Sequence, residues 1–145
     1  DVGPGYGTFF ADVTDPKNPK TVSFLPFEFG SHNVTVHPSG KVLYNSNSDL
    51  ITNPLAAIEI ADISDLTAPK KVADFALKPV PGLGTQAHDI TFNETGNRAY
   101  VAAISHGEIL DTSDPLAPKS ISATVDPAFQ VWHQIDEVEV AHVPA

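Results

Sequence analysis

The segment Asp-Thr-Ser-Asp-Pro-Leu-Ala-Pro-Lys, at residues 111–119, decides the fold because the chain contains it in three forms. Residues 12–20 read Asp-Val-Thr-Asp-Pro-Lys-Asn-Pro-Lys, and residues 62–70 read Asp-Ile-Ser-Asp-Leu-Thr-Ala-Pro-Lys. Successive copies begin about 50 residues apart, and a recurrence at that period indicates a chain built from repeated structural units.

A second segment recurs between these copies. Residues 32–36 read His-Asn-Val-Thr-Val, and residues 88–92 read His-Asp-Ile-Thr-Phe. In both, a Gly follows the His by eight positions and a Tyr follows it by twelve. A third copy begins at residues 132–135 (Trp-His-Gln-Ile), but no Gly follows at the matching distance and residues 136–140 alternate instead. Matches at this many fixed offsets favour one repeating unit over chance.

Each unit predicts four short β-strands. Apolar and polar residues alternate in residues 34–36 and 90–92, which is the period of a half-buried strand. Helical periodicity is absent. We expect first strands in these two segments, second strands at 41–46 and 98–104, third strands at 8–13, 57–63 and 108–111, and fourth strands at 21–25, 71–75 and 120–125. Four-stranded units in series are typical of a β-propeller, whose blades bury their faces against neighbouring blades.

The sequence therefore predicts an all-β fold, a β-propeller of four-stranded blades of which this chain covers about two and a half to three. We expect a single domain, divided into a partial blade (1–25), two blades (26–75 and 76–125) and the start of a next blade (126–145). A closed ring of four to eight blades needs about 200–400 residues, so the ring is expected to be incomplete. The chain contains no Met, so Asp1 is not a translation start. We expect a fragment completed by other residues, another chain or another copy.

The same residues carry a family resemblance. Residues 108–119, preceded by Ala-His-Asp-Ile at 87–90 and Ala-Tyr-Val-Ala at 99–102, resemble the LVIVD-repeat family of β-propellers. The resemblance covers roughly residues 8–133, and residues 135–145 do not continue its pattern. It implies a propeller fold in a mostly bacterial family that is often secreted or surface-attached and largely without assigned activity. A propeller fold by itself does not specify a function.

The composition excludes several classes of protein. Acidic residues outnumber basic ones by 18 to 8, which gives a net charge of −10. Such a surface repels phosphate backbones and anionic headgroups, so we expect no nucleic-acid partner. No apolar run approaches the roughly 20 residues that span a bilayer, so we expect no membrane insertion. The absence of Cys excludes disulfides and thiol catalysis, and signatures of serine hydrolases, phosphate loops and dinucleotide-binding folds are absent as well.

Strand directions sort the polar residues onto two ends of the ring. If each first strand runs from top to bottom, the repeated Asp-containing turns all lie at the bottom, and the long irregular connections lie at the top. Recognition is therefore expected at the top. The turn aspartates are expected to accept backbone N–H groups two residues further on. We assign a structural role in these turns to Asp12, Asp15, Asp62, Asp65, Asp111 and Asp114.

Three histidines, His32, His88 and His133, begin first strands and are expected at the top beside the ring axis. Neutral imidazoles that converge there could hold a divalent metal ion, with His106 and Asp49 as further candidate ligands on the same rim. An open coordination position would activate water or an oxidant. In the other interpretation, each His donates to a backbone carbonyl of the adjacent blade and serves as a repeated internal link.

The hairpin register and the remaining histidines complete these expectations. A tight turn between the first two strands would place His32 opposite Asn45 and His88 opposite Val101. His37 falls in a bottom turn and is expected to be a solvent-exposed bystander.

Two function classes remain open. The first is an acidic, secreted β-propeller that acts as a binding or interaction scaffold through its top face. The alternative is a metal-dependent enzyme, an oxidoreductase or a hydrolase, with its histidine cluster at the mouth of the central channel. Expected partners are proteins: another propeller segment, another copy or a component of a surface assembly. The expected location is extracellular or at the cell surface, with the periplasm as the other compartment.

Overall fold

The computed structural model describes residues 6–28, 30–47, 58–79 and 86–125, and this part of the chain contains ten β-strands and no helix. The strands are β1 (Gly7–Asp12), β2 (Lys20–Pro26), β3 (Asn33–Val36), β4 (Val42–Ser46), β5 (Ile58–Asp62), β6 (Lys70–Phe75), β7 (Asp89–Phe92), β8 (Arg98–Ala103), β9 (His106–Asp111) and β10 (Lys119–Thr124). Every expected strand is present, with bounds within two residues of the expectation. A membrane-crossing helix is accordingly not found in the described ranges.

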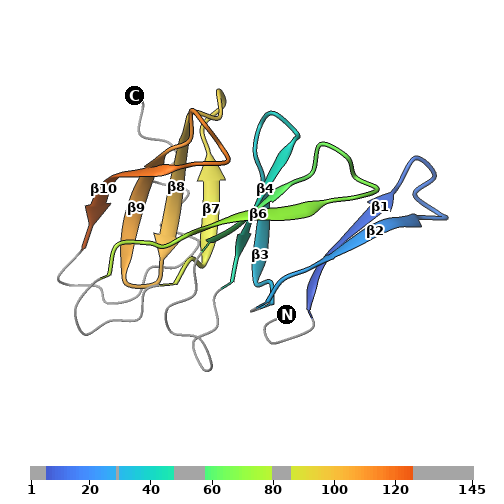
Figure 1. The fold of residues 1–145 in the computed structure, drawn as a ribbon, viewed down its shortest axis with the longest axis horizontal. Helices are drawn as coiled ribbons and strands as arrows, with labels where there is room; N and C mark the ends of the chain where they lie inside the picture. The colour runs from blue at the N-terminus through green and yellow to red at the C-terminus, as the bar shows by residue number, and fades with distance from the viewer. Residues whose placement is uncertain (1–5, 29, 48–57, 80–85, 126–145) are drawn as a thin grey trace.

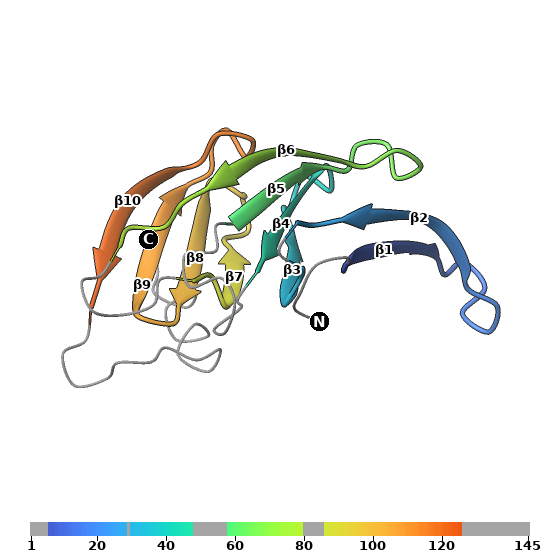
Figure 2. The same ribbon diagram turned by 60° about the horizontal axis from the view of Figure 1, so that its bottom comes forward.

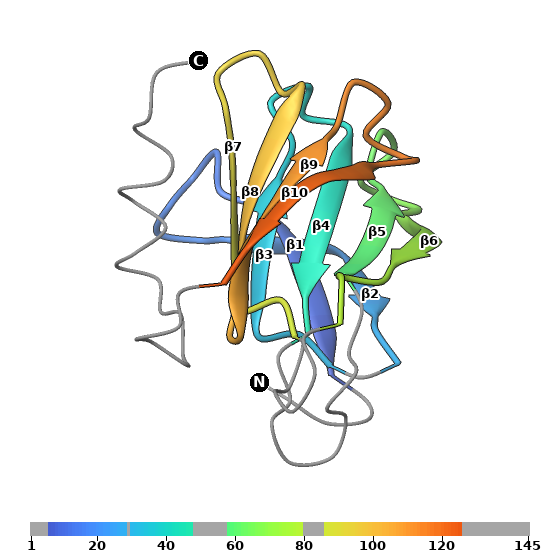
Figure 3. The ribbon, with the colours of Figure 1, turned by 90° about the vertical axis from the view of Figure 1, so that its left-hand side faces the viewer.

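The strands form three antiparallel sheets in chain order (Figure 1). We call β3–β6 blade 2, β7–β10 blade 3, and β1–β2, which pair with each other, the outer pair. Figure 2 shows the three sheets following one another along an arc, with β2, β6 and β10 on its outer side. Strands β3 and β7 contact each other across the gap between the blades, and Figure 3 shows blade 3 in front of blade 2. The chain is thus a segment of a β-propeller with an incomplete ring, which confirms the predicted fold class.

Two hydrophobic cores lie between successive sheets. We call the face of a sheet toward the preceding blade its rear face, and the opposite one its front face. The core between blades 2 and 3 includes Val42, Tyr44, Ile58, Ile60, Ile90, Val101 and Leu110. The core between the outer pair and blade 2 includes Leu25, Phe27, Leu43, Ala61 and Ile63. Since each fully buried aliphatic or aromatic side chain contributes about 1.5–3 kcal/mol, the contacts between successive sheets are a main source of the fold's stability.

Each outermost strand contains a bulge at the equivalent place in the repeat. Val22 in β2, Val72 in β6 and Ile121 in β10 have no opposite residue in the neighbouring strand, because the register shifts there. All three side chains are exposed. The bulge is therefore a regular feature of the repeating unit.

Hydroxyl groups link each sheet to the next one at the bottom turns. Tyr44 Oη of blade 2 donates to the carbonyl oxygen of Pro115 in blade 3, at 2.8 Å. Ser23 Oγ of the outer pair donates to the carbonyl oxygen of Leu66 in blade 2, at 2.5 Å. Leu66 and Pro115 occupy the same position of the repeated turn. Burial raises the pKa of the Tyr44 phenol, and the charge of Asp114 adds to the effect. The phenol therefore stays protonated and can donate this hydrogen bond.

His37 is a buried link between blades, and its prediction as a solvent-exposed bystander is wrong. Its Nδ1 accepts the backbone N–H of Ser39 at 3.1 Å, so the ring proton is on Nε2. Nε2 donates to the carbonyl oxygen of Gly96 in blade 3 at 2.8 Å, and the ring meets Phe92 edge-on. The neighbouring blade covers His37, and a bottom turn read in isolation does not reveal that cover.

The turn between the first two strands of each blade is longer than a tight hairpin. The register pairs Asn33 with Ser46 and Asp89 with Ala102. The backbone N–H of His32 donates to the carbonyl oxygen of Ser46, and that of His88 donates to the carbonyl oxygen of Ala102. The expected positions opposite Asn45 and Val101 are therefore wrong. The reason is that Gly40 and Gly96, both at positive φ, close turns with four residues between the last bonded pair.

These two glycines provide a matched test of the link at His37. A Cβ on Gly40 would meet nothing within 4 Å, whereas a Cβ on Gly96 would lie 2.5 Å from His37 Nε2. Gly40→Ala should cost about 1 kcal/mol for its left-handed backbone alone. Gly96→Ala should cost about 1–3 kcal/mol more, because it also disrupts a buried hydrogen bond. Urea unfolding of both variants measures the difference, and equal losses would contradict the link.

Candidate functional site

The bottom end of the segment is occupied by the repeated turns. The leading aspartates Asp12, Asp62 and Asp111 accept the backbone N–H two residues on, at 2.9 to 3.0 Å. The second aspartates, Asp15, Asp65 and Asp114, do the same at 2.9 to 3.1 Å. The hydroxyl and then the N–H of Thr14 lower the pKa of Asp12, since both stabilise its charged form. These carboxylates hold the turns together.

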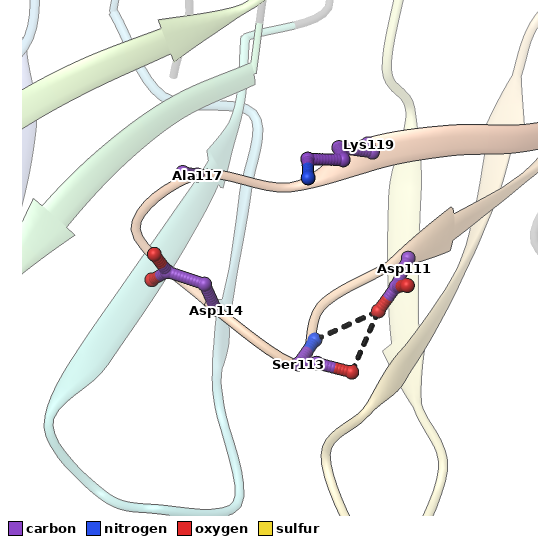
Figure 4. A pocket seen from close by; sticks show the side chains of 5 residues that line it. All are labelled: Asp111, Ser113, Asp114, Ala117 and Lys119. Carbon is purple, nitrogen blue, oxygen red and sulfur yellow. Dashed lines mark hydrogen bonds between the residues drawn. The ribbon is translucent and has the colours of Figure 1, made fainter.

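A pocket at the third turn consists of the turn itself. Asp111, Ser113, Asp114, Ala117 and Lys119 line it, and Figure 4 shows Ser113 bonded to Asp111 through both its N–H and its hydroxyl. The carboxylates that face this pocket already accept hydrogen bonds from their own turn. Its chemistry is that of the repeated turn, so we do not treat it as a binding site.

The top end brings two of the predicted histidines together. The rings of His32 and His88 lie with their centroids 4.4 Å apart and are inclined by 54°. His32 is exposed and His88 is half-buried. His133 and Asp49, the other candidates for this place, lie outside the described residues.

The histidine pair rests on a hydrogen-bonded seam between the two inner strands. Asn33 Nδ2 donates to Asp89 Oδ1 at 2.6 Å, and Asp89 Oδ1 also accepts the backbone N–H of Ile90. One step further down, Thr35 Oγ1 donates to the carbonyl oxygen of Ile90 at 2.9 Å. The two strands that carry the histidines are therefore fixed relative to one another.

His106 is part of a buried network in blade 3. Its Nδ1 lies 2.9 Å from Ser105 Oγ, and its Nε2 lies 3.1 Å from Glu108 Oε2. Glu108 Oε2 also accepts the backbone N–H of Lys78, which follows the outer strand of blade 2. Both ring nitrogens of His106 are thus engaged within the protein.

The carboxyl group of Glu108 remains charged although it is buried. Burial alone would raise its pKa, but hydrogen bonds from His106 and the Lys78 N–H outweigh burial, and the net effect lowers the pKa. A buried charge held in this way binds the chain at Lys78, where it leaves blade 2, to blade 3.

Glu59 occupies the same repeat position in blade 2, and sequence reasoning did not single it out. Its Oε2 accepts Asn45 Nδ2 at 3.0 Å and Asn47 Nδ2 at 3.2 Å, and its Oε1 lies 2.9 Å from Lys71 Nζ. Asn45 Nδ2 also donates to the carbonyl oxygen of Gly30, in the segment that enters blade 2. The repeat does mark this position, because a Glu precedes the leading Asp of the turn by three residues in both complete blades.

Metal-binding geometry is limited in the described ranges. These residues contain no group of three or more His, Asp or Glu side chains arranged to hold a metal ion. His32 and His88 form a pair, and His106 is bonded to Glu108. Any third ligand at the histidine pair would therefore come from outside the described residues.

Comparison with known proteins supports the fold and leaves the activity open. No family model matches the chain. No curated protein matches it either. A proposed 6-phosphogluconolactonase from Bacteroides fragilis superposes with a TM-score of 0.60 at 15% identity, over 79% of this chain and 31% of that one. A protein of unknown function from Desulfotomaculum acetoxidans gives a TM-score of 0.42 at 18% identity, over 81% of this chain and 49% of that one.

The likeness at this identity concerns the fold alone. The chain spans about a third of the length of the Bacteroides fragilis structure that it matches. The match agrees with the succession of four-stranded sheets described above, and the site must be argued from its own residues.

The buried network at Glu108 predicts how stability responds to acid. Because folding lowers the pKa of Glu108, its stabilising contribution is present above its ordinary pKa of 4.5 and disappears as the pH falls through the lower folded value. Glu108→Gln should lose about 1–3 kcal/mol near neutral pH and show a shallower acid limb. Urea midpoints between about pH 7 and about pH 3 test this. Glu94→Gln, in an exposed turn, is the control, and an unchanged acid limb in Glu108→Gln would contradict the assignment.

Proposed function

We propose that this chain belongs to a secreted or surface-attached β-propeller that acts as a binding scaffold, with its ligand received at the top face around His32 and His88. The observation that carries this proposal is the pairing of an exposed and a half-buried imidazole at the start of two inner strands. Imidazoles can donate and accept hydrogen bonds and stack on a ligand, which suits recognition of a polar partner.

The contrast between the two ends supports this choice of face. At the bottom, the turn carboxylates bind their own backbone, and the turn carbonyls of Leu66 and Pro115 bind the preceding sheet. Those groups are committed to holding the blades. At the top, the histidine pair stands on the Asn33–Asp89 seam, which fixes the two strands that carry the rings relative to one another. A binding surface built on fixed strands loses little conformational entropy when it takes a ligand.

Buried carboxylates stiffen the same end of the blades. Glu59 in β5 contacts Asn45 in β4 and Lys71 in β6, and so joins the three strands near the top of blade 2. Glu108 in blade 3 accepts the N–H of Lys78, in the segment that leaves blade 2. Each is fully buried and each contacts at least two donors. This arrangement favours a preorganised rim around the histidines.

The binding proposal predicts that recognition depends on the top face. The chain should bind a discrete set of members on peptide and glycan arrays. His32→Ala and His88→Ala should each weaken the strongest of these interactions at least about tenfold, the loss expected for one good hydrogen bond or stack. Lys70→Ala, on an exposed bottom residue, is the matched control. No array binding, or binding lost with Lys70→Ala and kept with both histidine variants, would overturn the proposal.

The metal-dependent enzyme remains a second candidate because His32 and His88 lie side by side. Two imidazoles from neighbouring strands are a common start for a Zn²⁺ or Cu²⁺ site, which needs at least one further ligand. This candidate predicts stoichiometric binding of Zn²⁺ or Cu²⁺ in calorimetric titration, abolished by His88→Ala and unchanged by Lys70→Ala. Binding weaker than millimolar, or equal in both variants, would dismiss it.

A further inference from the structure

Blade 2 contains a buried carboxylate with an amine at one oxygen and an amide at the other. Glu59 lies in β5, between β4 and β6. Its Oε1 lies 2.9 Å from Lys71 Nζ in β6, and its Oε2 accepts Asn45 Nδ2 in β4 at 3.0 Å. Glu59 and Asn45 are buried, and the side chain of Lys71 is 28% exposed. An amine and a carboxamide thus meet at one acid inside the protein.

The surroundings of this carboxylate are apolar. Leu43 and Ala61 lie two residues from Asn45 and Glu59 on the same strands, and alternate residues of a strand share a face. Both belong to the hydrophobic core between the outer pair and blade 2. Such surroundings disfavour charged groups, so a proton transfer that leaves a neutral amine and a neutral carboxylic acid costs less there than in water.

The acid is common to both complete blades, whereas the amine and the amide are not. In blade 3, Glu108 is opposite Val101 in β8, and Ser120 has the place that Lys71 has in blade 2. Blade 3 forms the same four-stranded sheet as blade 2. The fold of a blade therefore does not require an amine and an amide at these places, and their combination in blade 2 calls for another explanation.

We propose that Lys71 and Asn45 form a covalent amide bond that joins β6 to β4 across β5, with Glu59 as the proton carrier. A bond forms between Lys71 Nζ and the Cγ of Asn45, and the bond between that Cγ and Nδ2 breaks. Glu59 takes the protons that Nζ loses and gives them to the departing Nδ2, so its carboxylate is restored. An ammonium group and an amide become a secondary amide and an ammonium ion, and no co-reactant is consumed.

Asn45 is a better acceptor than Asn47, although both amides contact Glu59. Lys71 is opposite Ala61, which is itself opposite Leu43 in β4. Asn45 is two residues along the chain from Leu43, and Asn47 is four. Since a strand rises about 3.3 Å per residue, Asn47 lies roughly 7 Å further from the level of Lys71 than Asn45 does. The nearer amide is the one that the lysine side chain reaches.

A second carboxylate at Lys71 opposes the reaction. Asp74 Oδ1 lies 2.8 Å from Lys71 Nζ, and its side chain is half exposed. Burial alone would lower the pKa of Lys71, but the contacts with Asp74 and Glu59 raise it. A protonated nitrogen has no free electron pair, so Asp74 slows the attack. The bond is therefore expected to form slowly after the chain has folded.

The mass of the denatured chain tests the proposal directly. After folding and incubation, the chain should be lighter than its sequence requires by one ammonia, about 17 Da. Trypsin should release residues 42–70 joined to the peptide that begins at Lys71, because trypsin does not cleave after an acylated lysine. A chain that keeps its full sequence mass after prolonged incubation would overturn the proposal.

Four variants separate this bond from other losses of ammonia. Lys71→Arg and Asn45→Ala should each keep their full mass, whereas the matched controls Lys70→Arg and Asn47→Ala should lose ammonia as the unaltered chain does. Lys71→Arg preserves the positive charge beside Glu59, so the ion pair that supports the fold remains. An asparagine can also lose ammonia by closing an imide with its own backbone. A loss that persists in Lys71→Arg would be that reaction and would refute the cross-link.

Asp74→Asn tests the role of the amine by rate. Without this carboxylate the pKa of Lys71 falls, and the loss of ammonia should become about two- to fivefold faster, the effect of one exposed ion pair on a protonation equilibrium. Glu94→Gln removes the same charge in an exposed turn and should leave the rate unchanged. A slower loss in Asp74→Asn, or equal rates in the two variants, would contradict attack by Lys71. These outcomes are independent of binding at the histidine pair, which shares no residue with this site.

Discussion

The packing of one sheet's front face on the next sheet's rear face is the constraint on which the structure depends. No sheet in the described part of the chain has a core of its own, because both hydrophobic clusters lie between sheets. Hydrogen bonds complete each contact at the bottom, where a hydroxyl of one sheet meets a turn carbonyl of the next. At the top, Glu108 accepts the N–H of Lys78 in one connecting segment, and Asn45, which also donates to Glu59, donates to the carbonyl oxygen of Gly30 in another. Stability is therefore a property of neighbouring pairs, as in other repeat architectures.

The strands and the turns could be predicted from the sequence because their causes are local. Alternation in residues 90–92 and the Asp-Ser pattern at 111–113 act within a few residues, and each was seen in more than one copy. The pairing of His32 with His88 also followed, since strand direction alone sends both to the same end of the inner strands. The repeat supplied the long-range information that a single strand lacks.

What the sequence did not reveal depends on contacts between strands and between blades, and on the exact length of a turn. His37 is buried because Phe92 and the Gly96 carbonyl, in another blade, lie against it. Glu59 is buried within its own blade, where Asn45 in β4, Asn47 just after β4 and Lys71 in β6 satisfy it. Neither side chain carries a local signal of burial, and a charged Glu is normally expected at the surface. The register of the first hairpin was misjudged because Gly40 permits a longer turn than a two-residue one.

The bulges at Val22, Val72 and Ile121 have a consequence for behaviour in solution. Outermost strands of radial sheets carry unsatisfied backbone groups along the rim, where identical molecules could stack rim to rim into fibrous aggregates. An extra residue in the middle of each such strand breaks the straight row of donors and acceptors and increases its twist. A flat incoming strand can then match only one half of the rim at a time, which disfavours stacking of molecules rim to rim although each bulge exposes a β-branched side chain.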